Sequence, residues 1–344
     1  MSLVVVASER FVEHQTPPGH PESPERADAM DVVANEWRKK GGEVVAPRLA
    51  TREQLARVHD ESYRRRIEET AGIATALDPD TYTSPESHEI ALLAAGAAVD
   101  AVERVMANDG HAFALVRPPG HHAERNRAMG FCLYNNIAVA AAHARTIGAA
   151  RVGIVDYDVH HGNGTQHMFE NDPNVLYLSM HQFPFYPGTG AADEIGRGNG
   201  EGFTVNLPLE AGAVDEDYQI VFSEIVVPVL RQFKPDLLLV SAGFDAHERD
   251  PLAGMRLTTP AFGAMTQEIR RVAEECCGGR LMAITEGGYD LRAFAASMLS
   301  VVAVLGDSRG QPAAWPEAQA AVRPTRGQAT VAAARKILGR FWKF

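Results

Sequence analysis

Short runs of apolar residues alternate along the chain with longer segments of helical pattern. The runs are rich in β-branched residues and contain few polar positions, so both faces of each predicted strand are expected to be buried, as in a parallel sheet. The predicted strands are 3–7, 112–116, 151–158, 175–180, 236–242 and 281–286, and the predicted helices are 87–107, 135–148, 216–233 and 260–276. This alternation predicts a single α/β domain, with a mostly parallel multi-stranded sheet and helices on both faces.

Two segments lack this periodicity. Residues 182–202 are rich in glycine and proline, and loops of this length are usually functional or disordered. Residues 307–331 are rich in proline, glycine and alanine, and the basic segment 332–344 has an amphipathic helical pattern. We expect residues 1–310 to form the main domain and residues 311–344 a basic extension, docked on it as a helix. A helix for a membrane surface or a partner is the alternative.

Composition and charge limit the classes of protein to which the chain can belong. Hydrophobic residues make up 45% of the 344 residues and charged residues 22%, as in ordinary globular proteins. The formal net charge of −11 argues against nucleic-acid binding. Three cysteines, two of them adjacent, do not make a disulfide framework. Neither a signal peptide nor an apolar run of about 18–20 residues is recognisable. We therefore expect a cytoplasmic protein with no membrane partner, and a homo-oligomer is compatible with the sequence.

Polar residues of unusual type follow five of the predicted strands. The carboxyl ends of parallel strands lie at one edge of a sheet, where ligands bind in open α/β sheets. We therefore expect these residues to form one site. The stretches are "RPPGHH" after 112–116, "DYDVHHGNGT" at the end of 151–158, His181 after 175–180, "GFDAHERD" after 236–242 and "GGYD" after 281–286.

The stretch "DYDVHHG" predicts a metal site. On an extended strand Asp156, Asp158 and His160 point to the same face. Burying two carboxylates together is costly unless a cation compensates their charge. Asp245, from another strand, could complete a set of three ligands with Asp158 and His160, which leaves positions open for water and substrate. The alternative is that Asp156 and Asp158 only cap loops.

A metal site suggests that the histidine pair in "RPPGHH" takes part in proton transfer. A metal-bound water needs a base, and a leaving group needs an acid, and His121 and His122 could supply both. Asp156 is available to hold one ring and Asn163 the other. The hydroxyl of Tyr289, which follows two glycines, could donate to a developing oxyanion.

With these residues assembled, the chain resembles the zinc-dependent histone deacetylase branch of the arginase/deacetylase superfamily over about residues 15–305. The bacterial class-II-like amidohydrolases fit best, because Asn163 stands where class II has asparagine. The resemblance implies the arginase/deacetylase fold, a catalytic domain in 1–310, and removal of acetyl or other acyl groups from N-acetyl-lysine or a related amine, with release of acetate. The matching stretches are "HPESPER", "VHDESY", "LDPDTYTSPES", "RPPGHHA", "MGFCLYNN", "DYDVHHGNGTQ", "FYPGTG", "GFDAHERDPL" and "EGGYD".

The resemblance also implies a role for each site residue. Zinc would be held by Asp158, His160 and Asp245, although iron(II) or cobalt also suits such a ligand set. His121 would pair with Asp156 and act electrostatically, His122 would be the general base and then the acid, and Tyr289 would polarise the amide carbonyl. Gly130, Phe131, Tyr186 and Leu252 would line a tunnel, with Asp80 at its rim and Arg26 on an exit path for acetate. Potassium is implied at Asp156, Asp158, His160, Ser179 and Met180, and a second monovalent cation at Phe169, Asp172, Val175 and Phe203.

Several alternatives remain open at this point. An acetylpolyamine amidohydrolase would use the same chemistry, but one polyamine-selective branch has glutamate at the position of Leu252. A binuclear manganese hydrolase would need an acid where Gly162 stands. A non-catalytic acyl-lysine binder would be expected to lack Tyr289 or a metal ligand. The remaining histidines at 88, 111, 143, 167 and 247 are expected at the surface or as capping residues.

Overall fold

A computed structural model of the chain describes residues 2–108, 110–307, 313–317 and 323–344. Its centre is a sheet of eight strands in the order β2-β1-β5-β10-β9-β6-β7-β8, and every pair of neighbours is parallel. A small antiparallel pair, β3 (Thr75–Ala76) and β4 (Tyr82–Thr83), lies apart from it. The strands of the large sheet are β1 (Leu3–Val6), β2 (Glu43–Val45), β5 (His111–Ala114), β6 (Val152–Asp156), β7 (Val175–Gln182), β8 (Thr204–Leu209), β9 (Leu237–Ala242) and β10 (Leu281–Thr285).

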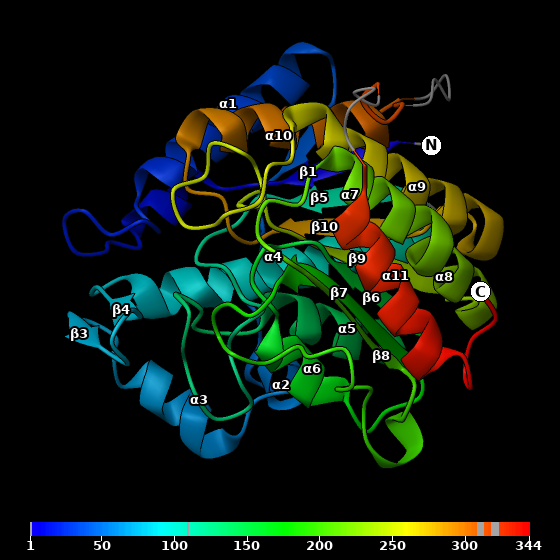
Figure 1. Ribbon diagram of the computed structural model, residues 1–344. Coiled ribbons are helices and arrows are strands. Elements are labelled where there is room, and N and C mark those ends of the chain that lie inside the picture. Colours follow the sequence, from blue (N-terminus) through cyan, green and yellow to red (C-terminus); the bar gives the residue numbers. More distant parts are fainter. Residues whose placement is uncertain (1, 109, 308–312, 318–322) are drawn as a thin grey trace.

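Helices cover both faces of this sheet (Figure 1). On one face α1, α10, α9 and α8 pack side by side, and α4, α5 and α6 pack on the other. The predicted α/β fold with a parallel sheet is therefore confirmed. The helices are α1 (Glu25–Lys39), α2 (Arg52–Ala56), α3 (Glu61–Glu68), α4 (Ser87–Asn108), α5 (Asn136–Thr146), α6 (Asn163–Phe169), α7 (Asp215–Val221), α8 (Val227–Phe233), α9 (Thr259–Cys277), α10 (Leu291–Leu305) and α11 (Thr325–Leu338).

The apolar pattern located the inner strands and missed the outer ones. Six predicted strands correspond to β1, β5, β6, β7, β9 and β10, which are buried along almost their whole length. The edge strands β2 and β8 were not predicted, because β2 has only three residues and β8 contains Pro208. The predicted helix 216–233 is observed as α7 and α8, joined by a π-helical turn at Phe222–Val226.

The basic C-terminal segment contains α11, which packs on α7 and β8. Val331 and Leu338 are buried there, and the Trp342 indole Nε1 donates to the Gly202 carbonyl at 2.8 Å. The expected boundary at 310–311 lies outside the described residues. In the part of the chain that is described, no helix combines the length and apolarity that a membrane span requires.

Candidate active site

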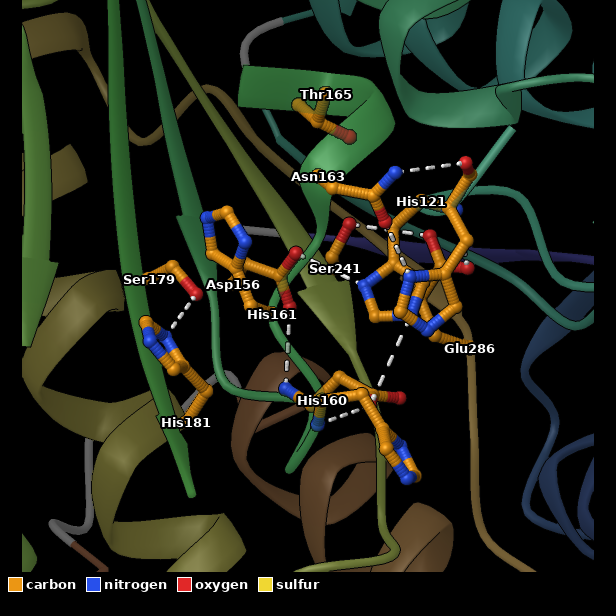
Figure 2. Close-up of polar contacts among 12 residues, drawn as sticks. His121, Asp156, His160, His161, Asn163, Thr165, Ser179, His181, Ser241 and Glu286 are labelled. Carbon is orange, nitrogen blue, oxygen red and sulfur yellow. Dashed lines mark hydrogen bonds and ion pairs between the residues drawn. The ribbon is translucent and has the colours of Figure 1, made fainter. Parts of the chain in front are cut away.

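The carboxyl ends of four neighbouring strands, β5, β10, β9 and β6, deliver most of the predicted residues to one edge of the sheet, whereas His181 lies within the adjacent strand β7. Figure 2 shows how those labelled in it lie together. His121 and His122 follow β5, Asp156 ends β6, Asp158 and His160 come directly after it, Asp245 follows β9, and Tyr289 follows β10.

Asp158, His160 and Asp245 come together as a candidate metal site. One ligand atom of each lies within 4.8 Å of the others, and all three residues are buried. His160 Nδ1 lies 3.2 Å from Asp158 Oδ1 and 3.1 Å from Asp245 Oδ2. Backbone amides orient both carboxylates, since Gly287 N donates to Asp158 Oδ2 and Val159 N donates to Asp245 Oδ1. Two carboxylates and one imidazole are a donor set that zinc accepts in proteins.

The electrostatics of the triad also favour a cation. Burial opposes a charge on His160, but hydrogen bonds to Asp158 and Asp245 outweigh it and raise the pKa of this histidine to about 10. The field that holds a proton between two buried carboxylates would equally attract a divalent cation. The residues therefore fit the metal that the sequence predicts.

Two glycines lie so close to the carboxylates of the site that no larger residue would fit in their place. A Cβ on Gly287 would lie 2.0 Å from Asp245 Oδ2. A Cβ on Gly162 would lie 2.4 Å from Asp156 Oδ2 and 2.5 Å from the Tyr177 hydroxyl. An acidic side chain at position 162, which a second metal would need, therefore has no room. This packing supports a site for a single metal ion.

His121 is held by Asp156. The Nδ1 atom of His121 lies 3.1 Å from Asp156 Oδ2, which also accepts from the Tyr177 hydroxyl at 3.0 Å. Burial opposes a charge on the ring, but Asp158 and Asp156 raise the pKa of His121 to about 10. The pairing with Asp156 therefore favours the positively charged form of His121.

His122 has the opposite electrostatic environment. Its Nδ1 faces Asn163 Oδ1 at 2.8 Å, and Asn163 begins α6. Burial and the nearby rings of His121 and His160 hold the pKa of His122 well below its usual value. Two adjacent histidines thus differ in charge, because one has a carboxylate partner and the other an amide.

A cavity of about 190 Å³ opens in front of these residues. Gly130 and Phe131, on its wall, have positive φ values of 56° and 68°. Asp80 Oδ1 accepts from Gly130 N, so this carboxylate braces the turn as well as facing the cavity. The lining residues are Asp80, Pro119, His121, His122, Gly130, Phe131, His160, Phe185, Tyr186, Leu252, Gly287 and Tyr289.

Tyr289 is anchored through its backbone. Asp250 Oδ2 accepts from Tyr289 N at 2.7 Å, and Asp250 Oδ1 accepts from Leu252 N at 3.0 Å. One buried carboxylate therefore connects the tyrosine with the tunnel wall. Burial raises the pKa of the Tyr289 hydroxyl well above its usual value, so the group remains a proton donor. The Arg26 guanidinium lies over the Tyr289 ring, 5.2 Å from its centre.

The residues predicted for monovalent cations lie in two places. Ser179 is the neighbour of Asp156 across β6 and β7, and its hydroxyl lies 2.9 Å from His181 Nδ1, as Figure 2 shows. Phe169, Asp172 and Val175 follow one another in a turn in which Asp172 N donates to the Phe169 carbonyl and Val175 N to the Asp172 carbonyl. Tyr177 N donates to the Phe203 carbonyl, which brings Phe203 beside this turn.

Four supporting residues were not found from the sequence. Glu286 accepts from the backbone amides of Gly120 and His121, and its other oxygen accepts from the Ser241 hydroxyl. Glu124 accepts from the Asn163 amide, and Phe185 stacks on the His160 ring. Glu286 stands in the "EGGYD" motif, but nothing in the pattern showed that its carboxylate reaches the histidine loop.

His111, His143 and His247, which were expected at the surface or as capping residues, do not lie at the surface. All three are buried. His111 Nδ1 lies 2.7 Å from the Leu305 carbonyl, and His247 Nε2 lies 3.1 Å from the Thr259 hydroxyl. Such buried, hydrogen-bonded rings can replace apolar residues in a core, and periodicity alone does not reveal them.

A parallel sheet with a buried candidate metal triad and a histidine pair at its carboxyl edge is the arrangement that the sequence predicts for a hydrolase of the arginase/deacetylase fold. The profile of the histone deacetylase domain matches residues 20–305. The chain therefore belongs to the histone deacetylase family, and it carries a hydrolytic deacetylase domain.

Individual proteins agree with this assignment. The chain is 43% identical over 281 residues to "Histone deacetylase 14, chloroplastic" of Arabidopsis thaliana, a match that covers 76% of this chain and 65% of that protein. It is 40% identical to "Polyamine deacetylase HDAC10" of Homo sapiens, over 82% of this chain and 45% of that protein. The crystal structure of the HDA15 HD domain superposes with a TM-score of 0.90 at 39% identity and covers 99% of this chain and 95% of that one. The chain thus spans less than two thirds of the length of the Arabidopsis histone deacetylase 14 and of the human polyamine deacetylase.

Proposed function

We propose that the protein is a zinc-dependent amidohydrolase that removes acetyl groups from N-acetyl-lysine side chains or a related N-acetylated amine and releases acetate. The observation that carries this proposal is the buried Asp158–His160–Asp245 triad beside a cationic and a neutral histidine, where His160 and both histidines line one cavity. Bound zinc would supply Lewis-acid activation of water and of the amide carbonyl. Iron(II) or cobalt would suit the same ligands.

Side chains of the protein would carry out proton transfer, stabilise the developing charge and exclude water. His122, neutral, lining the cavity and with Nδ1 facing Asn163, takes the proton of the attacking water on Nε2 and later gives it to the leaving amine. His121 stays charged beside Asp156 and stabilises negative charge that develops nearby. The Tyr289 hydroxyl donates to the developing oxyanion. Phe131 and Tyr186 form walls that exclude water around an extended alkyl chain.

We further infer the cation sites that the family resemblance implies. Asp156, Asp158, His160, Ser179 and Met180 would hold potassium, and the Phe169–Val175 turn with Phe203 would hold a second monovalent ion. The position of Ser179 beside Asp156 and the carbonyls of the Phe169–Val175 turn support this assignment. We also infer that 311–344 is a docked extension of the catalytic domain, supported by the α11 contacts. The three free cysteines agree with a cytoplasmic location.

The residue at position 252 on the cavity wall bears on which class of substrate the enzyme prefers. Leu252 on the cavity wall favours an uncharged acyl-lysine stem over a polyamine, which carries a second ammonium group. One relative is named a polyamine deacetylase, so acetylated polyamines are the alternative. We expect kcat/KM to be higher for an acetyl-lysine peptide than for acetylputrescine or acetylspermidine.

The Leu252→Glu variant tests whether residue 252 selects between acetyl-lysine peptides and acetylated polyamines. One carboxylate near the bound ammonium is expected to shift the ratio of kcat/KM values about tenfold toward the polyamines, equivalent to roughly 1.4 kcal/mol. Leu252→Gln, of similar size but neutral, is the matched control. A wild-type preference for polyamines would show that the proposed substrate class is wrong.

A further inference from the structure

The amide of Asn163 lies between two different partners. Its Nδ2 donates to Glu124 Oε1 at 2.6 Å, with longer contacts to the His122 carbonyl at 3.5 Å and Met129 Sδ at 3.4 Å, and its Oδ1 faces His122 Nδ1 at 2.8 Å. A carboxylate only accepts hydrogen bonds, whereas the two ends of an amide differ, because the nitrogen donates and the oxygen accepts. If the Asn163 amide were reversed, two oxygens would face each other at this short distance. The Glu124 carboxylate, the nearest of the three acceptors and the only charged one among them, therefore favours the orientation in which the Asn163 oxygen faces the histidine.

The orientation of Asn163 has a consequence at His122. An oxygen opposite Nδ1 accepts a hydrogen bond, so the proton of the neutral ring is placed on Nδ1. The lone pair is then on Nε2, the atom that a general base presents to water. With an amide nitrogen opposite Nδ1, the other tautomer would be favoured, and Nε2 would carry a proton when a base is needed.

We propose that Glu124 is a positioning residue, which acts through Asn163 to hold His122 in the tautomer that can accept a proton. This inference rests on the proposed function for the role of His122, and it adds the residue that selects the state of that histidine. Glu124 does not line the cavity and therefore does not touch the substrate.

The surroundings show that Glu124 is held in place. Its backbone carbonyl lies 3.0 Å from Nδ1 of the buried His59, and its backbone N donates to the Arg127 carbonyl. Its side chain is only 14% exposed. His167, one helical turn after Asn163 on α6, approaches the same Oε1 at 2.8 Å. Glu124 thus contacts two residues of α6, and of these two only Asn163 also contacts His122.

Three substitutions separate this role from simple packing. In Glu124→Lys, a residue that only donates stands opposite Asn163, which favours the reversed amide. In Asn163→Asp, position 163 still accepts from His122, but two carboxylates then lie side by side. In the double variant Glu124→Lys/Asn163→Asp, lysine and aspartate pair, and the aspartate accepts from His122 Nδ1. The double variant therefore restores the arrangement that each single variant disturbs.

We expect Glu124→Lys to have a kcat about ten- to a hundredfold below wild type, the population ratio that one charge-assisted hydrogen bond sets, with a smaller change in KM. Asn163→Asp, which keeps an acceptor opposite His122 Nδ1, should lose less. The double variant is expected to exceed Glu124→Lys by about tenfold or more. Glu124→Gln, which can still accept, should fall between wild type and Glu124→Lys. The matched control is His167→Asn, which removes the other partner of the same carboxylate and should retain wild-type kcat.

A spectroscopic measurement tests the tautomer directly and needs no turnover. In ¹⁵N-labelled protein, His122 should show a protonated Nδ1 and an unprotonated Nε2 in wild type and in the double variant, and the reverse or a mixture in Glu124→Lys. Multiplicative effects in the double variant, or an unchanged His122 spectrum in Glu124→Lys, would overturn the inference. Absence of acetate release by wild type would instead refute the proposed function, because the spectrum reports on Glu124 in either case.

Discussion

Replacing His122 with alanine is expected to lower kcat by about 10²–10⁴-fold, the contribution that a positioned general acid–base makes. His122 is buried, and its Nδ1 is occupied by Asn163, so Nε2 is the atom left for proton transfer. KM should change little, because the ring forms only one part of the cavity wall. Steady-state acetate release from an acetyl-lysine peptide measures both constants.

His121→Ala provides the comparison. His121 is bound to Asp156 and charged, so its removal should cost less in kcat than removal of His122. Equal metal content in the two variants would show that the difference arises in proton transfer. A larger loss in His121→Ala, with metal retained, would contradict the assigned roles.

Tyr289→Phe is expected to lower kcat by about 10²–10³-fold, the usual effect of removing one donor to an oxyanion. The substitution deletes only the hydroxyl. The backbone bond from Tyr289 N to Asp250, the ring contact with Phe131 and the guanidinium of Arg26 over the ring all remain. The variant should therefore fold and bind metal as the wild type does.

The same variant should keep its affinity for a substrate that it turns over slowly. Binding of the acetyl-lysine peptide, measured by calorimetry, is expected to stay within a few-fold of a catalytically impaired His122→Ala reference. A kcat close to that of wild type would show that the hydroxyl of Tyr289 does not stabilise the transition state.

Much of the fold and of the candidate site could be predicted from the pattern of the sequence. Strands buried on both faces leave unbroken apolar runs, and a parallel sheet brings their carboxyl ends to one edge. That rule alone placed Asp158 and Asp245, 87 positions apart, beside the same histidine. Edge strands and the short helices around them depend on tertiary contacts, which a local pattern does not contain.

The residues that support the site could not be predicted in the same way. Glu286 and Asp250 use their carboxylates on backbone amides of other loops, and any acidic residue near a turn would look the same in the sequence. Glu124 follows the histidine pair by only two positions, but its contact with Asn163 depends on how α6 is placed. Such partners are set by three-dimensional packing and become visible only in the structure.

The most direct test of the central claim is a metal titration. Metal-free protein would be titrated with zinc while bound metal and acetate release from an acetyl-lysine peptide are followed together. The account predicts that activity rises in proportion to bound zinc, saturates at one ion per chain, and is absent in Asp245→Ala. Undiminished acetate release by the metal-free protein, or none by the fully loaded protein, would contradict it.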